Sequence, residues 1–484
     1  MSGTSLATGP APAPRPPPPS AGPRHHRPRG LTDPVRGYPA SMSTTAQPRQ
    51  SEQAAEASDR GGERPLERGE WRTLAVLGVP TFALALAITT VTTYLPVVAE
   101  SFAASTVVIG VLIGGEGLLA LGLPVIVGAW SDRLRTRLGG RLPFVLVATP
   151  PLVLSLAILG YAGSVLAAAI IVAAFFAAYY IAYEPYRALY PDLVDDDIAG
   201  RAQSTQGLFR GAATCLALVG GGLLISIGTP VPFFAAAAIT AVSMAVFAWA
   251  LIRRGIPEQR RTAESVSDAA VSLRDCIAER PELRAFLVAN ALWELSLAAL
   301  KTFVVLYITR GLGFSVSESA LIIGAGAVVI LLATPISGKL ADRLGRARVM
   351  RVGLYVYGVG LLVPVFTQST VLLVLAIPLV AFGGGVIMTL PYALLMPMMP
   401  AGQHGALSGF YSLSRGLGTA LGPLFAGVAI ALLRDPLSST KGYAAMWLVC
   451  SLAILASIPF VSRLRDAETE AEDADDAAAG AAPA

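Results

Sequence analysis

The feature that most constrains this chain is a series of long apolar runs. There are twelve such segments. Each has roughly 20 mostly apolar residues, which is enough for a helix to cross a hydrocarbon core about 30 Å thick. The composition agrees, since 54% of the 484 residues are hydrophobic and only 14% are charged. The sequence therefore predicts an all-α integral membrane protein with twelve transmembrane helices.

The apolar runs form two sets of six. The first set lies at 74–99, 104–130, 142–161, 165–190, 206–227 and 231–252. The second set lies at 285–308, 319–338, 352–366, 371–396, 407–433 and 443–461. We therefore expect six-helix bundles at 69–253 and 285–465, joined by a hydrophilic cytoplasmic linker at 254–284.

The two ends of the chain have a different composition. Residues 1–68 are rich in proline, alanine, serine and charged residues, and residues 466–484 are acidic and rich in alanine. Neither end has a periodic apolar face that could offset the entropy of ordering, so we expect both to be disordered. Met42 is an alternative start to Met1, because the stretch before it lacks the apolar core of a signal peptide.

Basic residues in the short loops predict the orientation. Arginines follow the second run, and a lysine and arginines follow the eighth, whereas the loops after the third, fifth and ninth runs contain neither. Positive charge in short loops stays on the cytoplasmic side, so both termini should be cytoplasmic, and we expect a multi-pass protein of the plasma membrane. Arg310, Arg434 and Lys441 are mild exceptions on the predicted outer side.

Several function classes are disfavoured by what the sequence lacks. The three cysteines and three histidines match no metal-ligand spacing, so we expect no metal and no cofactor. A glycine-rich phosphate loop with lysine is missing, which removes the case for an ATP-driven pump. The net charge of +4 is spread over loops rather than gathered on one face, which disfavours nucleic acid as a partner. Without a nucleophile or metal set, we do not expect an enzyme.

The two halves repeat one another. The second run ends in GAWSDRL, starting at Gly128, and the eighth ends in GKLADRL, starting at Gly338, 210 residues later. The motif PYRALYP in the fourth run is answered by PYALLMP in the tenth, and LFRGAAT around Arg210 by LSRGLGT around Arg415. An even number of spans per half gives a parallel repeat about an axis along the membrane normal, which is the arrangement of two-domain transporters.

Gly128-x-x-x-Asp132-Arg133, followed by Arg141, resembles the signature loop of the major facilitator superfamily. The resemblance covers 71–465 and implies two pseudo-symmetric six-helix bundles. SDR, RLGGRLPF and PYRALYPDL further resemble the glycoside-pentoside-hexuronide and sucrose proton-symporter branches. Leu119 and Leu123 stand where sodium-coupled members carry aspartates, which disfavours sodium coupling.

The resemblance also implies a conformational gate in the repeated loop motifs. A carboxylate near a helix end can hold arginines in one conformation and release them in the other. The alternative is that these charges only fix topology and solvate a loop. The gating candidates are Gly128, Asp132, Arg133, Arg141, Gly338, Asp342 and Arg343.

Charged residues inside the runs are candidates for function, because each costs roughly 2.5 kcal/mol or more at mid-depth. Glu116 falls near the middle of the second run. Asn290, Glu294 and Lys301 share one face of the seventh. Glu294 is the first choice for a proton-binding carboxyl, with Glu116 second. The alternatives are a structural ion pair of Glu294 with Lys301, and a buried carboxyl at Glu116 that bonds within its own half.

Polar residues near the end of the fourth run are further candidates. Tyr183, Glu184 and Arg187 either line a solute path, with Glu184 as a third proton-coupling candidate, or form an interfacial belt. The resemblance implies a coupling role for Arg187. Arg210 and Arg415 occupy equivalent places in the repeat, and either contact solute or anchor their helices at the interface.

Trp293 offers a flat face on which a sugar could stack, although a lone tryptophan more often packs. Together these residues predict alternating access by a monomer in membrane lipid, with protons and a small-molecule solute as partners. A sugar or glycoside imported with protons is the first expectation, and proton-driven efflux of amphipathic compounds is the alternative. A scaffold or sensor that kept the fold and lost transport is the alternative from another class.

Overall fold

Helices dominate every described range of the chain. The structure, a computed structural model, describes residues 68–194, 198–254, 280–395 and 404–480. Within these ranges, twelve helical spans are long and apolar enough to cross a membrane. The predicted fold class and the predicted number of spans are therefore confirmed. The segment expected to be disordered at 1–68 and most of the predicted linker at 254–284 lie outside the described residues.

The first half contains six spans, one of which is built from three consecutive elements. The spans are α2 at Arg68–Ser101, α3 at Thr106–Arg133, α4 at Leu142–Leu159, α5 at Val165–Leu193, the succession α6 at Ala199–Cys215, η2 at Leu216–Gly220 and α7 at Gly221–Ile225, and α8 at Val231–Arg254.

The second half repeats this order. Its spans are α10 at Pro281–Leu306 continued by η3 at Tyr307–Gly311, α11 at Val316–Leu344, α12 at Arg346–Phe366, α13 at Thr370–Leu395, α14 at His404–Leu432 and α15 at Ala445–Gly480, with the short 3₁₀ turn η5 at Ser438–Thr440 before α15.

Serine caps begin three of these helices at the predicted outer side. Ser105 accepts a hydrogen bond from the third backbone amide of α3, and Ser164 does the same for α5. Ser315 forms a reciprocal capping box with Glu318 at the start of α11. Each cap satisfies backbone amides that have no partner inside the helix, so the sequence fixes these starts locally.

Two spans contain a turn of π-helix. One is η2 in the fifth span and the other is η3 in the seventh. The hydroxyl of Tyr94 on α2 donates to the carbonyl of Leu218 inside η2. Widened turns of this kind occur often at functional sites. Here, η2 lies beside the seam between the two halves, where it contacts α11.

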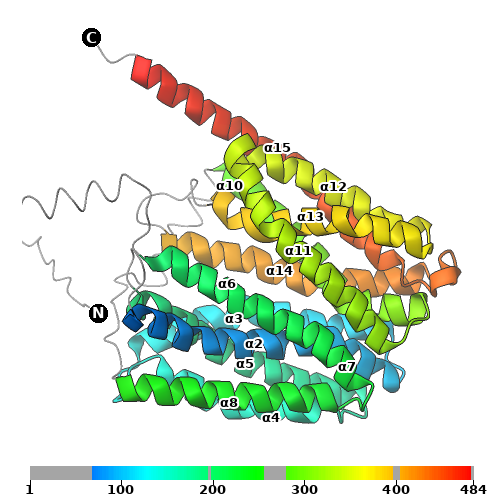
Figure 1. Ribbon diagram of the computed structural model, residues 1–484, viewed down its shortest axis with the longest axis horizontal. Coiled ribbons are helices and arrows are strands. Elements are labelled where there is room, and N and C mark those ends of the chain that lie inside the picture. Colours follow the sequence, from blue (N-terminus) through cyan, green and yellow to red (C-terminus); the bar gives the residue numbers. More distant parts are fainter. Residues whose placement is uncertain (1–67, 195–197, 255–279, 396–403, 481–484) are drawn as a thin grey trace, which may run out of the picture. The chain divides into compact units, whose positions relative to one another are not determined.

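Each half is packed around its own buried core. One cluster of buried apolar side chains comes almost entirely from α2 to α8, and the other almost entirely from α10 to α15. Figure 1 shows the same division, with the first-half helices in the lower part of the bundle and the second-half helices in the upper part. Two cores are what a pair of bundles that move relative to one another requires.

Small residues bring the two halves together along α3 and α14. A Cβ added at Gly117 would meet the backbone of Gly416 and Ala420, and one added at Gly427 would meet the backbone of Thr106. The hydroxyl of Thr106 also donates to the carbonyl of Gly427, at 2.8 Å. Membrane helices associate through such close backbone approach, because lipid supplies no hydrophobic driving force.

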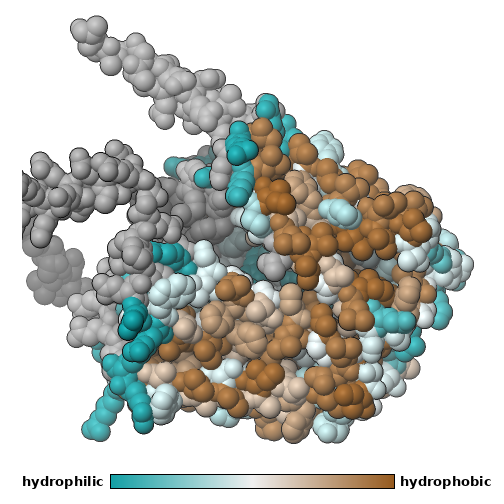
Figure 2. Space-filling view, in the orientation of Figure 1, coloured by the Kyte–Doolittle hydropathy of each residue, from teal (hydrophilic) through white to brown (hydrophobic). Residues whose placement is uncertain are grey.

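The outer surface of the bundle carries a broad apolar belt. Figure 2 shows hydrophobic side chains over the middle of the bundle and hydrophilic ones toward its ends. Many large apolar side chains in this belt are exposed, among them Leu166 at 71%, Val371 at 69% and Leu154 at 62%. Such a surface is suited to lipid and would cause association in water.

The helix ends differ from the sequence predictions at two places. The helix α15 continues to Gly480, through most of the acidic tail that was expected to be disordered. Alanine and glutamate are among the strongest helix formers, and they extend a helix that the last span has already nucleated. The helix α10 begins at Pro281, so the final residues of the predicted linker are helical. Proline suits the first helical turn because its missing amide hydrogen has no partner there.

Candidate functional site

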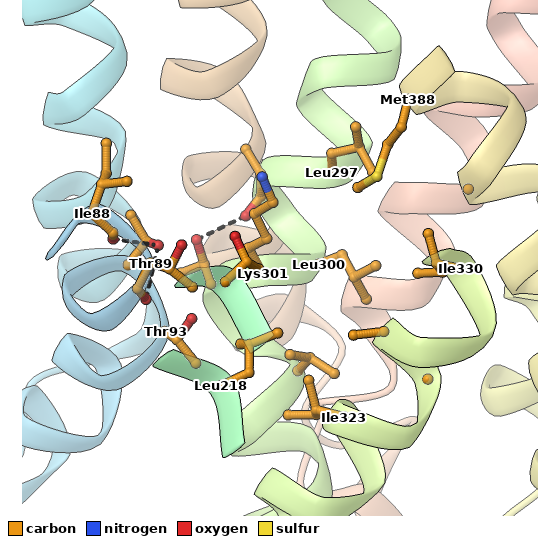
Figure 3. Close-up of a pocket in the computed structure, with 18 of the residues that line it drawn as sticks. Ile88, Thr89, Thr93, Leu218, Leu297, Leu300, Lys301, Ile323, Ile330 and Met388 are labelled. Atoms are coloured by element: carbon orange, nitrogen blue, oxygen red, sulfur yellow. Dashed lines mark hydrogen bonds between the residues drawn. The ribbon is translucent and has the colours of Figure 1, made fainter. Parts of the chain in front are cut away.

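A cavity of about 780 Å³ lies between the two halves. Its wall includes residues of α2, α3, α5 and α6 from the first half and of α10, α11, α13 and α14 from the second. Figure 3 shows Thr89 and Thr93 of α2 on one side and Ile330 and Met388 of the second half on the other. The volume is within the range of small-molecule sites.

Eight of the ten residues predicted for proton coupling or solute contact line this one cavity. They are Glu116, Tyr183, Glu184, Arg187, Arg210, Glu294, Lys301 and Arg415. They come from α3, α5, α6, α10 and α14, so only the tertiary structure brings them together. Their roles in coupling and solute binding stay predictions.

Glu294 forms an ion pair in the cavity wall. Its carboxylate lies 3.4 Å from the guanidinium of Arg415, which joins α10 to α14. The sequence suggested Lys301 as the partner, on the same helix as Glu294. Lys301 instead interacts electrostatically with Glu116 of the first half. Arg415 reaches Glu294 because α10 and α14 pack closely, and Gly418 and Gly422 leave room for the backbone of α10.

Glu116 faces the tyrosines of α5 across the first half. The hydroxyl of Tyr180 donates to its carboxylate at 3.5 Å. Tyr180 is packed edge-on against Tyr179, and Tyr179 is stacked on Tyr183 with ring centroids 5.3 Å apart. A carboxylate and an aromatic stack therefore share one wall of the cavity. Sequence analysis did not select Tyr179 or Tyr180 as site residues, although their place in the tyrosine-rich end of the fourth run was a signal.

Two arginines approach Tyr183 from different sides. The guanidinium of Arg210 donates to its hydroxyl at 3.4 Å. The guanidinium of Arg187 lies over its ring, 5.5 Å from the centroid. Glu184 is close enough to Arg187 to interact electrostatically with it. Tyr183 is thus the centre of a cationic group formed by α5 and α6.

The opposite wall of the cavity is mainly apolar. Ile323 and Ile330 of α11 and Met388 of α13 face it, together with Leu297 and Leu300 of α10 (Figure 3). A solute in this cavity therefore meets charged and aromatic groups on one side and aliphatic groups on the other. This division matches the arrangement of many small-molecule sites, where a few polar groups set orientation within an apolar pocket.

Asn290 and Trp293 do not line the cavity. The amide of Asn290 donates to the hydroxyl of Ser414, and the indole of Trp293 donates to the hydroxyl of Ser457. Both side chains are about 1% exposed. Neighbouring residues on a helix point about 100° apart, so Trp293 faces α15 while Glu294 faces the cavity. Asn290 shares the face of Glu294, but α14 covers it one turn away. The predicted solute contacts of both residues are therefore wrong.

The loop motif of the first half forms a charged cluster. Arg141 lies 2.5 Å from Asp192 and 3.4 Å from Asp132, which joins the ends of α3 and α5 to the start of α4. Arg133 is exposed beside it. Asp192 was not selected from the sequence, although it ends the PYRALYPD motif. The cluster has the composition expected of the predicted gate, whose function stays a prediction.

The equivalent motif of the second half closes α11. Arg343 is exposed, and the side chain of Asp342 lies outside the described residues. Gly128 and Gly338, at equivalent places in the two motifs, have no atom within 4 Å of an added Cβ. Neither glycine is therefore required by a close contact in this conformation.

A second charged cluster joins the two halves at the predicted outer side. Arg310 lies 2.7 Å from Glu100, and the hydroxyl of Tyr443 donates to the same carboxylate at 2.9 Å. Burial and the neighbouring carboxylate raise the pKa of Tyr443, so its hydroxyl stays protonated and able to donate. Sequence analysis recorded Arg310 only as an exception to the orientation rule, and this pairing accounts for it.

Metal ligands are not grouped anywhere in the ranges that the structure describes. Within them, no three histidine, cysteine, aspartate or glutamate side chains are close enough together to hold an ion.

Comparison with known proteins gives partial relatives and full-length structural matches. Multidrug resistance protein 3 of Bacillus subtilis is 28% identical over 111 residues, which is 23% of this chain and 21% of that protein. An uncharacterized MFS-type transporter of Mycobacterium tuberculosis strain H37Rv is 33% identical over 102 residues, which is 21% of this chain and 14% of that protein. The matched segments thus span about a fifth or less of these relatives.

Solved structures match over most of the chain. A bacterial homolog of the human lysosomal transporter Spinster gives a TM-score of 0.69 at 14% identity, covering 83% of this chain and 98% of that chain. The nucleoside transporter NupG gives 0.64 at 13% identity, covering 81% and 98%. These likenesses show the fold. The family model of the Major Facilitator Superfamily matches residues 77–306 and 286–483, and the chain therefore belongs to this superfamily of transporters.

Proposed function

We propose that this chain couples the movement of protons to the transport of a small organic solute, with a sugar or glycoside as the favoured solute. The observation that carries the proposal is the Glu294–Arg415 ion pair in the wall of a cavity between the two halves. Charged side chains inside membrane spans are costly, and they commonly mark the path of a solute or ion. In alternating access, such a cavity faces one side of the membrane at a time.

Glu116 supplies a route for coupling. It lies on α3 of the first half and interacts electrostatically with Arg415 and Lys301 of the second half. A proton on Glu294 removes the charge that holds Arg415 and frees the guanidinium to turn toward Glu116. Proton binding would thereby strengthen a link across the seam between the two halves. The energy of such a change is available because the two arrangements differ in their ion pairs.

The polar wall supports a sugar or glycoside as solute. Tyrosine hydroxyls, carboxylates and guanidinium groups all offer hydrogen bonds to sugar hydroxyls. The stacked rings of Tyr179 and Tyr183 offer a flat apolar face to the C–H groups of a sugar ring. Both kinds of contact are available within one cavity.

The apolar wall supports a second candidate, proton-driven export of amphipathic compounds. Aliphatic side chains of α11 and α13 would hold an apolar body without fixing its orientation. The relatives and solved structures include a multidrug resistance protein and a nucleoside transporter, so they favour neither solute class.

Proton movement in proteoliposomes separates these candidates. The purified chain is reconstituted with a pH dye inside, and a panel of sugars and glycosides is added without an imposed gradient. We expect acidification of the interior with one of them, and loss of that signal in Glu294→Gln. The matched control is Glu282→Gln, which changes the same residue type in the first turn of α10, away from the cavity.

The outcomes distinguish three functions. Silence with every sugar, together with extrusion of a cationic amphiphile under an imposed proton gradient, would replace the import proposal with export. Silence in both assays from protein that melts at the normal temperature would favour a scaffold or sensor. A signal that Glu294→Gln leaves intact would remove this carboxylate from the coupling mechanism.

A further inference from the structure

The charges in the cavity wall do not balance. Among the described residues that line it, four are cationic and three are carboxylates. The cations are Arg187, Arg210, Lys301 and Arg415, and the carboxylates are Glu116, Glu184 and Glu294. All four cationic side chains belong to exposed residues, whereas the three glutamates are only partly exposed. An entering solute therefore meets the positive groups first.

Three of the cations converge on one hydroxyl group. Arg210 donates to the hydroxyl of Tyr183, Arg187 lies over its ring, and Arg415 is close enough to interact electrostatically with the same side chain. These arginines come from α6, α5 and α14, so both halves contribute to the group. Tyr183 is neutral and cannot compensate their charge while its hydroxyl remains protonated.

The carboxylates are engaged at the edges of this group. Glu294 takes Arg415, Glu184 interacts with Arg187, and Glu116 accepts from Tyr180 and interacts with Lys301. Within the described part of the chain, Arg210 contacts only the neutral hydroxyl of Tyr183. It is therefore the excess cation of the wall. An uncompensated charge inside a membrane protein is unfavourable, and a bound anion removes that cost.

We propose that the solute is an amphipathic organic monoanion whose acidic group binds between Arg187 and Arg210, beside Tyr183. Guanidinium groups suit this role because their planar fork matches carboxylate, sulfate and phosphate oxygens. The aliphatic side chains of α11 and α13 then hold the apolar body of the solute. The inference rests on the proposed function, because it takes the same cavity as the solute site.

A matched pair of probes tests the charge alone. Phenyl β-glucoside is neutral, and its 6-sulfate ester adds one permanent negative charge that does not titrate between pH 5 and 8. Phenyl sulfate supplies the anion without the sugar. Binding of each probe to the purified full chain is measured by titration calorimetry in detergent, so that the result does not depend on coupling or transport.

We expect the sulfate ester to bind at least about ten-fold more tightly than the neutral glucoside, because charge-assisted hydrogen bonds are the stronger kind. Arg187→Gln and Arg210→Gln should each weaken the ester about ten-fold and change the neutral glucoside by less than about two-fold. Arg210→Lys should recover part of the loss, since it restores the charge without the fork. Arg348→Gln on α12, which removes an exposed arginine away from the cavity, should change neither.

The outcomes separate this inference from the proposed function. If the neutral glucoside binds as well as its ester, or if the arginine variants weaken both equally, the anion proposal is overturned while the glycoside proposal stands. If phenyl sulfate binds through Arg187 and Arg210 but neither glucoside does, the anion site stands and the glycoside proposal falls. If none of the three probes binds to protein of normal melting temperature, the anion proposal is overturned.

Discussion

Arg141 shows how burial sets the importance of a single charge. Its side chain is 7% exposed and contacts two aspartates that differ in their surroundings. The side chain of Asp192 is 1% exposed, whereas that of Asp132 is 43% exposed. Removing one partner of a buried ion pair leaves an uncompensated charge, whereas an exposed pair is screened by water.

We therefore expect Asp192→Asn to destabilise the protein more than Asp132→Asn. The first should lower the free energy of unfolding by about 3 kcal/mol, because it leaves Arg141 buried without its closer partner. The second should cost less than about 1 kcal/mol. Denaturant unfolding of both variants in mixed micelles measures the difference, and equal losses would contradict the role assigned to burial.

Trp293 supports a second prediction at this scale. Because its indole donates to Ser457 in the core, Ser457→Ala should reduce stability by about 1 kcal/mol or less, which is typical for a hydrogen bond between membrane helices. Solute affinity should not change. Thermal melting and a binding titration on the same preparation test both parts. A weakened affinity at unchanged stability would return Trp293 to the solute site.

The paired helices α3 and α14 show how an element's small residues control the relation between bundles. Gly117 faces the backbone of α14, which cannot move aside as a flexible side chain would. Gly122, on the same helix, has open space around an added Cβ. The same substitution at these two glycines therefore separates loss of close approach from loss of glycine itself.

We expect Gly117→Val to force α3 and α14 apart and to favour a conformation that is open at the Glu100 end. Gly122→Val should have little effect on the conformational equilibrium, apart from a small gain in helix propensity from removing glycine. Distances between spin labels on α3 and α14 report the change. If both variants show the wild-type distribution, then the contact at Gly117 does not hold the two helices in this conformation.

The whole molecule depends on which contacts join its two halves. At the Glu100 end, Glu100 of the first half meets Arg310 and Tyr443 of the second. A single carboxylate thus links two helices of the opposite bundle. Because the Arg310 side chain is 56% exposed, the link is weak enough to break during a transport cycle.

We expect Glu100→Gln to shift the halves toward the form that is open at this end, and Arg310→Gln to do the same. The exchange of charges in Glu100→Arg with Arg310→Glu should restore the closed form in part, with Tyr443 no longer placed to donate to a carboxylate. Labelling of a cysteine introduced on α7 near this end measures the opening. A double exchange that labels like the single variants would argue against a direct ion pair.

Individual residues show how far sequence reasoning reached into the site. The helical period placed Glu294 and Lys301 on one face of a span, and both line the cavity. The same period could not show that α14 covers Asn290, or that Arg415 rather than Lys301 pairs with Glu294. Those partners come from a helix far away in the chain, and no local pattern records which helices become neighbours.

The sequence by itself determined the twelve spans, the two repeated halves and the places of most charged cavity residues. These features depend on local quantities: the length of an apolar run must match the thickness of a bilayer, and the faces of a helix follow from its period. Tertiary structure alone decided the partners of those charges, the apolar wall opposite them and the cluster around Glu100. Such contacts depend on the packing of helices from distant parts of the chain, where shape and small residues rather than hydropathy select the neighbours.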